Sequence, residues 1–225
     1  GLTGATSASF DVTPAAATKL AVGQQPGSAA SGAALSPSVT VLVQDAFDNT
    51  VTGASTAVTV ALGTNPGGST LGGTLTVNAA AGIATFANLT LDKVGVGYTL
   101  DFTAGGLTGA SSGAFSITPG AAAQLAFGQQ PTSSTGGGVI APAVTVLVQD
   151  AAGNTVTGAT SSVSLAFGAN PGSGTLGGTV SASAVAGVAT FSDLTVDKVG
   201  TGYTLAASSA GLTGATSAAF DVTPG

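Results

Sequence analysis

The chain has 225 residues, of which 44% are hydrophobic and only 5% charged, and nine aspartates against three lysines give a net charge of −6. Glu, Arg, His, Cys, Met and Trp are absent, which excludes disulfides, soft metal sites and the clustered cations that nucleic-acid binding requires. No apolar run approaches the roughly 18 residues that cross a bilayer, and acid–base catalysis at neutral pH normally uses histidine, glutamate or a tuned aspartate pair. We therefore expect no enzyme, no cofactor, no nucleic-acid partner and no membrane span in this segment.

The first predicted element, GLTGATSASFDVTP at residues 1–14, returns as GLTGATSAAFDVTP at 211–224. Its Ala8, Phe10 and Val12 alternate with polar residues, as in a strand with one buried face. Residues 16–120 align with 121–225 without a gap, and 63 of these 105 positions are identical, which is about 60%. This repetition predicts the last strand of a preceding repeat at 1–14, repeat 1 at 15–119 and repeat 2 at 120–225, within a longer array.

Within each repeat the hydrophobic residues follow the two-residue period of strands, and no amphipathic helix of useful length is present. In repeat 2 the alternating segments lie at 144–148, 163–167, 189–191, 194–196, 203–207 and 218–222, with Gly-, Asn- and Asp-rich turns between them. Seven or eight short strands in about 100 residues predict an antiparallel sandwich of two sheets. The predicted core residues are Val41, Val43, Val60, Phe86, Leu100 and Phe115 in repeat 1, and Val146, Val148, Leu165, Phe191, Leu205 and Phe220 in repeat 2.

Two local features refine this prediction. The first strand of repeat 2, LAFGQQP at 125–131, runs into Pro131, so it could break there and resume in the other sheet. In LTVDKVGTGYTL at 194–205, an Asp-rich turn delivers Tyr203 to the start of a strand, and Tyr98 has the same place in repeat 1. This arrangement is similar to a tyrosine corner, in which the hydroxyl ties down a neighbouring loop.

The ordered series VTVLVQDAxxNTVTGA, GxATFxxLTxD, GYTL and LTGATSxxFDVT occurs in both repeats. This series resembles bacterial immunoglobulin-like repeats of the kind found in invasin/intimin-type adhesins and other giant bacterial surface proteins. The resemblance implies an all-β chain of two tandem Ig-like antiparallel β-sandwiches joined by a short linker. It also implies an extracellular or cell-surface location and a spacer role, with any receptor-binding module elsewhere in the array.

Asp45, Asp48 and Asn49 cluster in QDAFDN and could form part of a calcium loop. However, Ca²⁺ requires six to eight oxygen ligands, and repeat 2 has Asp150, Gly153 and Asn154 at the same places. A site that loses a carboxylate between copies is more simply a hairpin turn, in which Asp and Asn side chains bond to the backbone. A turn is therefore our interpretation, and a Ca²⁺ site completed by other oxygens is the alternative.

Two further motifs have a functional and a structural interpretation. The Asp92-Lys93 and Asp197-Lys198 pairs could support an isopeptide crosslink, as in some bacterial surface Ig-like domains, but Gly-flanked turns favour solvated pairs. Asn88-Leu89-Thr90 fits an N-glycosylation acceptor, whereas repeat 2 has Asp193 in place of the asparagine. We interpret both motifs as structural.

The function that these features predict is a structural repeat segment of an extracellular bacterial surface or fibre protein, acting as a durable, stiff spacer or stalk. Its partners would be neighbouring repeats of the same array. One alternative is a polymerising subunit of an extracellular filament or sheath, with strand addition between copies. A second alternative is an adhesive module for carbohydrate or a host receptor, although only 5% of residues are aromatic and contact hot spots favour Trp, Tyr and Arg.

Overall fold

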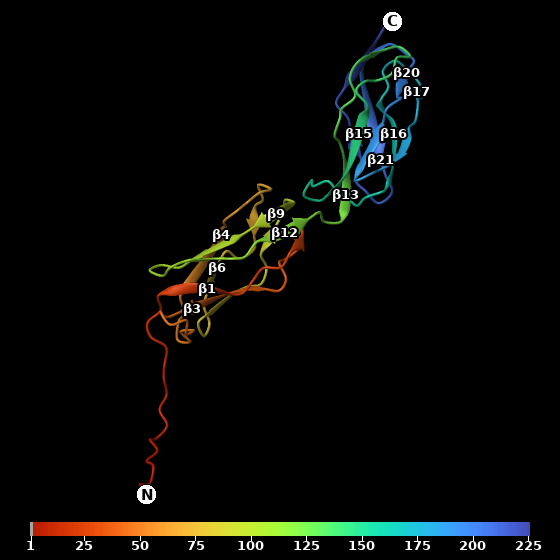
Figure 1. The fold of residues 1–225 in the computed structure, drawn as a ribbon. Helices are drawn as coiled ribbons and strands as arrows, with labels where there is room; N and C mark the ends of the chain where they lie inside the picture. The colour runs from red at the N-terminus through yellow and green to blue at the C-terminus, as the bar shows by residue number, and fades with distance from the viewer. Residues whose placement is uncertain (1) are drawn as a thin grey trace. The chain divides into compact units, whose positions relative to one another are not determined.

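The structure is a computed structural model that describes residues 2–225 (Figure 1). Its described residues form strands, turns and irregular segments, without a helix. Contacts divide the chain into two compact units, and the main boundary along the sequence falls between Ile117 and Thr118. Most of unit 1 is drawn from repeat 1 and most of unit 2 from repeat 2, and each unit is described by itself.

Unit 1 is built from short strands joined by tight turns. The strands are β1 (Lys19–Gln24), β2 (Ala29–Ala30), β3 (Val39–Gln44), β4 (Ala57–Leu62), β5 (Leu71–Gly72), β6 (Thr76–Asn78), β7 (Ile83–Phe86), β8 (Thr90–Leu91), β9 (Gly95–Tyr98), β10 (Leu100–Thr103), β11 (Ala110–Ser111) and β12 (Phe115–Thr118). They pair in the orders β1-β3-β7, β11-β10-β4-β6, β2-β12-β9 and β5-β8.

Unit 2 repeats this arrangement. Its strands are β13 (Ala122–Phe127), β14 (Ser134–Thr135), β15 (Val144–Asp150), β16 (Ser162–Ala169), β17 (Leu176–Gly177), β18 (Ser181–Ser183), β19 (Val188–Phe191), β20 (Thr195–Val196), β21 (Gly200–Ser208), β22 (Ala215–Thr216) and β23 (Phe220–Thr223). One sheet has the order β13-β15-β19, the other β14-β23-β21-β16-β18, with β22 also paired to β21. The short pair β17-β20 completes the unit.

The first strand of unit 2 divides between the two sheets. β13 pairs antiparallel with β15, whereas β14, which follows Pro131, pairs parallel with β23. Because proline has no backbone N–H, the ladder with β15 ends before it. The sheet switch that the sequence at 125–131 predicts is therefore present.

The hydrophobic core of each unit is formed by the inward-facing residues of its sheets and follows the alternation of the strands. In β15, for example, every second residue from Val144 to Val148 is fully buried, and the intervening residues are half-buried. All twelve predicted core residues are buried, with at most 5% of the side chain exposed. Tyr203 also lies in the core of unit 2, where its ring packs against Phe167 and Phe220 at centroid distances of 5.4 and 5.9 Å.

The hairpin between β6 and β7 turns through two residues with a left-handed backbone. Ala81 has a φ of 51° and Gly82 a φ of 78°. In unit 2, Ala186 and Gly187 take the same conformation, with φ values of 50° and 79°. A two-residue turn with positive φ at both positions matches the twist of the flanking strands, and alanine tolerates that conformation less well than glycine.

The N-terminal segment is not a strand in this structure. No strand is assigned to residues 2–18, and Ala8, Phe10 and Val12 are exposed, Phe10 to 80% and Val12 to 85%. A strand requires a neighbour for its backbone hydrogen bonds, and residues 2–14 pair with no strand among the described residues. Its assignment to a preceding repeat stays a prediction. Separately, none of the described segments is a helix long and apolar enough to span a bilayer.

Candidate functional site

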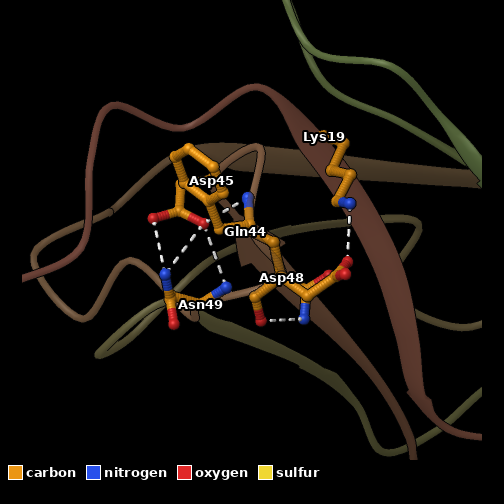
Figure 2. Close-up of polar contacts among 6 residues, drawn as sticks. Lys19, Gln44, Asp45, Asp48 and Asn49 are labelled. Carbon is orange, nitrogen blue, oxygen red and sulfur yellow. Dashed lines mark hydrogen bonds and ion pairs between the residues drawn. The ribbon is translucent and has the colours of Figure 1, made fainter.

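The turn that follows β3 contains a fully buried carboxylate. Asp45 is 0% exposed, and its Oδ1 accepts hydrogen bonds from the backbone N–H groups of Phe47 at 2.9 Å and Asn49 at 3.0 Å. The side-chain amide of Asn49 donates to both carboxylate oxygens, at 3.3 and 3.0 Å (Figure 2). The short Asp–Asn spacing favours this local arrangement, because both side chains bond readily to turn backbone.

The same carboxylate also holds a residue from a distant part of the sequence. Asp45 Oδ2 accepts a hydrogen bond of 2.9 Å from the backbone N–H of Ala15, the residue that follows Pro14 and precedes β1. These donors lower the pKa of Asp45 to about 2, the largest contribution coming from the Asn49 side chain, against a smaller opposing effect of burial. The carboxylate therefore stays ionised and ties the start of the repeat to the turn.

Unit 2 contains the same site. Asp150 is 2% exposed; its Oδ1 accepts from the N–H groups of Ala152 at 3.0 Å and Asn154 at 2.9 Å, and the Asn154 amide donates to both oxygens. Its Oδ2 accepts a 2.9 Å hydrogen bond from the N–H of Gly120, which follows Pro119. Burial raises the pKa of Asp150, but the hydrogen bonds outweigh it and lower the pKa overall. We call these two sites the aspartate clamps of Asp45 and Asp150.

Asp48, the third residue of the calcium hypothesis, does not join the clamp. Its backbone has a φ of 68°, and its carboxylate faces the Lys19 ammonium, with Nζ and Oδ1 2.6 Å apart (Figure 2). Gly153 takes the same place in unit 2 with a φ of 81°. The requirement at this position is therefore a left-handed backbone, which glycine and aspartate both adopt.

The predicted ligands thus lie together in sequence without forming a cage of oxygens. The oxygens of Asp45 face N–H donors, and Asn49 directs its amide nitrogen towards Asp45. No cluster of three or more acidic, histidine or cysteine side chains that could hold a metal occurs in residues 2–225. The arrangement has the chemistry of a hydrogen-bonded anchor.

The candidate glycosylation asparagine is also a structural residue. Asn88 Oδ1 accepts the backbone N–H of Thr74 at 2.9 Å, and Asn88 Nδ2 donates to Thr74 Oγ1 at 3.2 Å. In unit 2, Asp193 holds Thr179 in the same way, through its N–H at 2.9 Å and its hydroxyl at 2.8 Å. Asn88 and Asp193 thus both accept the threonine N–H, whereas the hydroxyl of the threonine accepts from Asn88 and donates to Asp193.

The Asp197-Lys198 pair lies in an exposed turn. Asp197 accepts the backbone N–H of Thr175 at 2.6 Å, and the backbone carbonyl of Lys198 accepts the hydroxyl of Tyr203 at 2.9 Å. The exposed lysine lacks the buried setting that an isopeptide crosslink needs. The Tyr203 hydroxyl fixes the loop before its own strand, which is the task that a tyrosine corner performs; Tyr98 is fully buried at the same position of unit 1.

The contact of each clamp with the N–H of Ala15 or Gly120 was not anticipated, because 30 residues separate donor from acceptor. One sequence signal could have indicated it. The Asp and Asn of the clamp are identical in both repeats, whereas Asp48 is replaced by Gly153. The retained pair marks the two side chains that hold the backbone.

The strand order, the divided first strand and the buried tyrosine define each unit as an Ig-like antiparallel β-sandwich. Neither a family model nor a curated protein matches the chain. Similar solved structures include the Escherichia coli adhesin FdeC (20% identity, TM-score 0.37) and invasin, a bacterial integrin-binding protein (21% identity, TM-score 0.33). A β-glycosidase from Bacteroides vulgatus is similar at 15% identity with a TM-score of 0.40.

These similarities extend over nearly all of this chain but only parts of the other proteins. The match with FdeC covers 96% of this chain and 66% of FdeC. The match with invasin covers 92% of this chain and 39% of invasin, and the match with the glycosidase covers 92% of this chain and 25% of the glycosidase. At these identities and TM-scores the matches define no family. The fold assignment rests on the strand pairing itself.

Proposed function

We propose that the chain is a structural segment of an extracellular bacterial surface or fibre protein, in which Ig-like units act as a durable, stiff spacer. The observation that carries this proposal is the aspartate clamp. In each unit a buried carboxylate binds the first backbone N–H after the proline that precedes the repeat. A clamped linker residue loses conformational freedom, and a short, restrained linker between domains gives a stiff connection.

The proposed role is non-catalytic. Both clamp carboxylates are saturated with hydrogen bonds, and the lowered pKa of Asp45 is the opposite of what a general acid at neutral pH requires. Both tyrosines are buried, so they do not offer the exposed aromatic anchors that typify carbohydrate and receptor contacts. These features support a spacer over an enzyme or an adhesive module.

The test measures the distance distribution between spin labels placed on the full chain at Thr59→Cys and Ser164→Cys, two exposed positions in different units. The wild-type chain has no cysteine, so labelling is unambiguous. We expect one narrow distribution that broadens in Asp150→Asn, because Gly120 is then released. Asp45→Asn is the matched control, since it frees Ala15, which does not lie between the units, and leaves the distribution unchanged.

A broad distribution in the wild-type chain, insensitive to Asp150, would contradict the stiff spacer. The exposed Phe10 and Val12 favour a second candidate, a filament subunit that adds strands between copies. Light scattering of the full chain across a concentration series separates the two, because a filament subunit grows in mass and a spacer does not. A specific signal on a glycan array would instead support the adhesive module.

A further inference from the structure

The exposed N-terminal segment has almost the same sequence as the last strands of unit 2. Residues 2–14 correspond to 212–224 with an offset of 210, and they differ only where Ser9 replaces Ala219. Ala219 is exposed, whereas Ser217, Phe220 and Val222 are buried. Every residue that the core of unit 2 receives from this strand therefore has an identical counterpart in the N-terminal segment.

Backbone pairing holds residues 213–223 along most of their length. Ala215 and Thr216 pair with β21, Phe220 pairs with Tyr203 across the same strand, and Val222 and Thr223 run parallel to β14. In addition, the N–H of Leu125 donates to the carbonyl of Thr213 at 2.8 Å. Backbone hydrogen bonds of this kind are available to any segment that fits between β14 and β21, a site that we call the β14–β21 slot.

Three side chains add the sequence-specific contacts. The Phe220 ring packs on Tyr203 at a centroid distance of 5.9 Å, and Ser217 Oγ accepts the backbone N–H of Leu205 at 2.9 Å. Asp221 Oδ1 accepts the N–H of Gly202 at 2.9 Å. The N-terminal segment supplies the same three groups as Phe10, Ser7 and Asp11.

We propose that residues 3–13 are a transferable terminal strand, and that their binding partner is the β14–β21 slot of unit 2 in a second copy of this chain whose own last strand is displaced or missing. The register places Phe10 at the position of Phe220 and Val12 at that of Val222. Strand exchange of this kind joins copies through backbone hydrogen bonds, with the side-chain pockets providing selectivity. The inference does not rest on the spacer role; it gives the second candidate above, the subunit that adds strands between copies, a specific partner and register.

The N-terminal segment matches the last strand of unit 2 more closely than that of unit 1. In unit 1, Ser116 stands where unit 2 has Asp221, and Gly113 where unit 2 has Ala218. The N-terminal segment carries Asp11 and Ala8 at these positions and so matches unit 2. In this register Asp11 takes the place of Asp221, whose Oδ1 accepts the N–H of Gly202.

The test uses two deletion chains and a synthetic peptide of residues 2–14. Residues 1–211 carry the free segment and an open slot, and residues 15–211 carry only the open slot. We expect the first chain to form linear oligomers in multi-angle light scattering, and Phe10→Ser in it to give monomers. Adding the peptide to the second chain should raise its Tm by at least about 5 °C at saturation.

The control peptide is Ser9→Asp, which changes an outward position and should bind as well as the wild type, whereas Phe10→Ser should not bind. If residues 15–211 do not fold alone, refolding from denaturant with the peptide replaces the melt. Recovery of folded protein with the wild-type and Ser9→Asp peptides, and not with the Phe10→Ser peptide, supports the proposal. Equal recovery with Phe10→Ser, or none with any peptide, overturns it.

Engineered cysteines test the register directly. Thr135 pairs with Thr223 in parallel, so a peptide with Thr13→Cys should form a disulfide with Thr135→Cys in the 15–211 chain. A peptide with Thr6→Cys lies away from β14 in this register and should not. Crosslinking of both peptides at similar yield would show non-specific association and overturn the assigned register.

Discussion

The two aspartate clamps show how a single buried charge can organise a chain that contains few charges. Asp150 is removed from water, and burial of a carboxylate is costly unless hydrogen bonds replace the lost hydration. Three backbone N–H groups and one side-chain amide supply that replacement. The carboxylate thus joins the β15 turn to the beginning of its unit.

Asp150→Asn tests this clamp at the level of stability. An amide has one acceptor oxygen, and its NH₂ group would face the N–H donors of Gly120 or Asn154. We expect the free energy of unfolding of unit 2 to fall by roughly 1–3 kcal/mol, with faster hydrogen exchange in β13 and β15, measured by mass spectrometry. Asp48→Gly is the control, because unit 2 has a glycine there; it should change stability by less than about 0.5 kcal/mol. A loss in Asp48→Gly equal to that in Asp150→Asn would contradict this account.

The β6–β7 hairpin is the element in which sequence and backbone disagree most clearly. Its turn needs positive φ at two successive residues, and the first is an alanine. Gly82 cannot be replaced, because a Cβ there would lie 2.6 Å from the carbonyl oxygen of Val51. Ala81 is exposed, so its unfavourable contribution to stability comes from its backbone conformation alone. A glycine at this position would remove that contribution.

Ala81→Gly is therefore expected to stabilise unit 1, by about 0.5–1 kcal/mol, since glycine adopts the left-handed conformation without strain. Chemical denaturation of the full chain measures the change. The neighbouring substitution Ala80→Gly gains no such relief and should destabilise by a similar amount. If both substitutions shift the unfolding midpoint in the same direction, the positive φ of Ala81 is not the cause.

The last strand of unit 2 contributes core packing as well as hydrogen bonds. Phe220 is 4% exposed and lies against the Tyr203 ring. Phe220→Ala should lower the free energy of unfolding by roughly 3–5 kcal/mol, observed by calorimetry as a lower transition temperature. Ala219→Ser, which gives residues 212–224 the sequence of the N-terminal segment, should leave that temperature unchanged. A melt that hardly moved in Phe220→Ala would show that this strand is not part of the core.

At the scale of the whole molecule, the loss of folding stability in acid depends on buried and turn carboxylates from both units. The pKa of Asp45 is lowered from 3.8 to about 2, and those of Asp150 and Asp193 are also lowered. A carboxyl whose pKa is lower in the folded state contributes stability above its unfolded pKa and loses it as the pH falls through the folded value. The Tm should therefore be flat between about pH 5 and 8 and fall from about pH 4 towards pH 2.

Thermal melts across this pH range check the prediction, and Asp150→Asn should show a shallower decline than the wild type. The prediction is contradicted by a Tm that already falls between about pH 8 and 5, where no aspartate with a lowered pKa titrates.

Much of the whole-molecule architecture could be predicted from the two-residue period and the internal repeat. Val146 and Val148, for example, alternate with half-buried neighbours, and Pro131 marks the sheet switch. The clamps could not be predicted, because an Asp–Asn turn has the same local pattern whether or not a distant N–H reaches it. The N-terminal segment differs from its prediction because its strand-like sequence lacks a neighbouring strand in this structure.

The parallel pairing of β14 with β23 has a consequence for a unit under tension. β14 lies near the beginning of unit 2 and β23 near its end, with Ser134 opposite Val222 and Thr135 opposite Thr223. Pulling the two ends apart slides these parallel neighbours lengthwise, so their hydrogen bonds bear the load together in shear. Strands that are peeled apart from one end lose such bonds one at a time. Unit 2 should therefore resist a steady pull and yield abruptly when this patch ruptures.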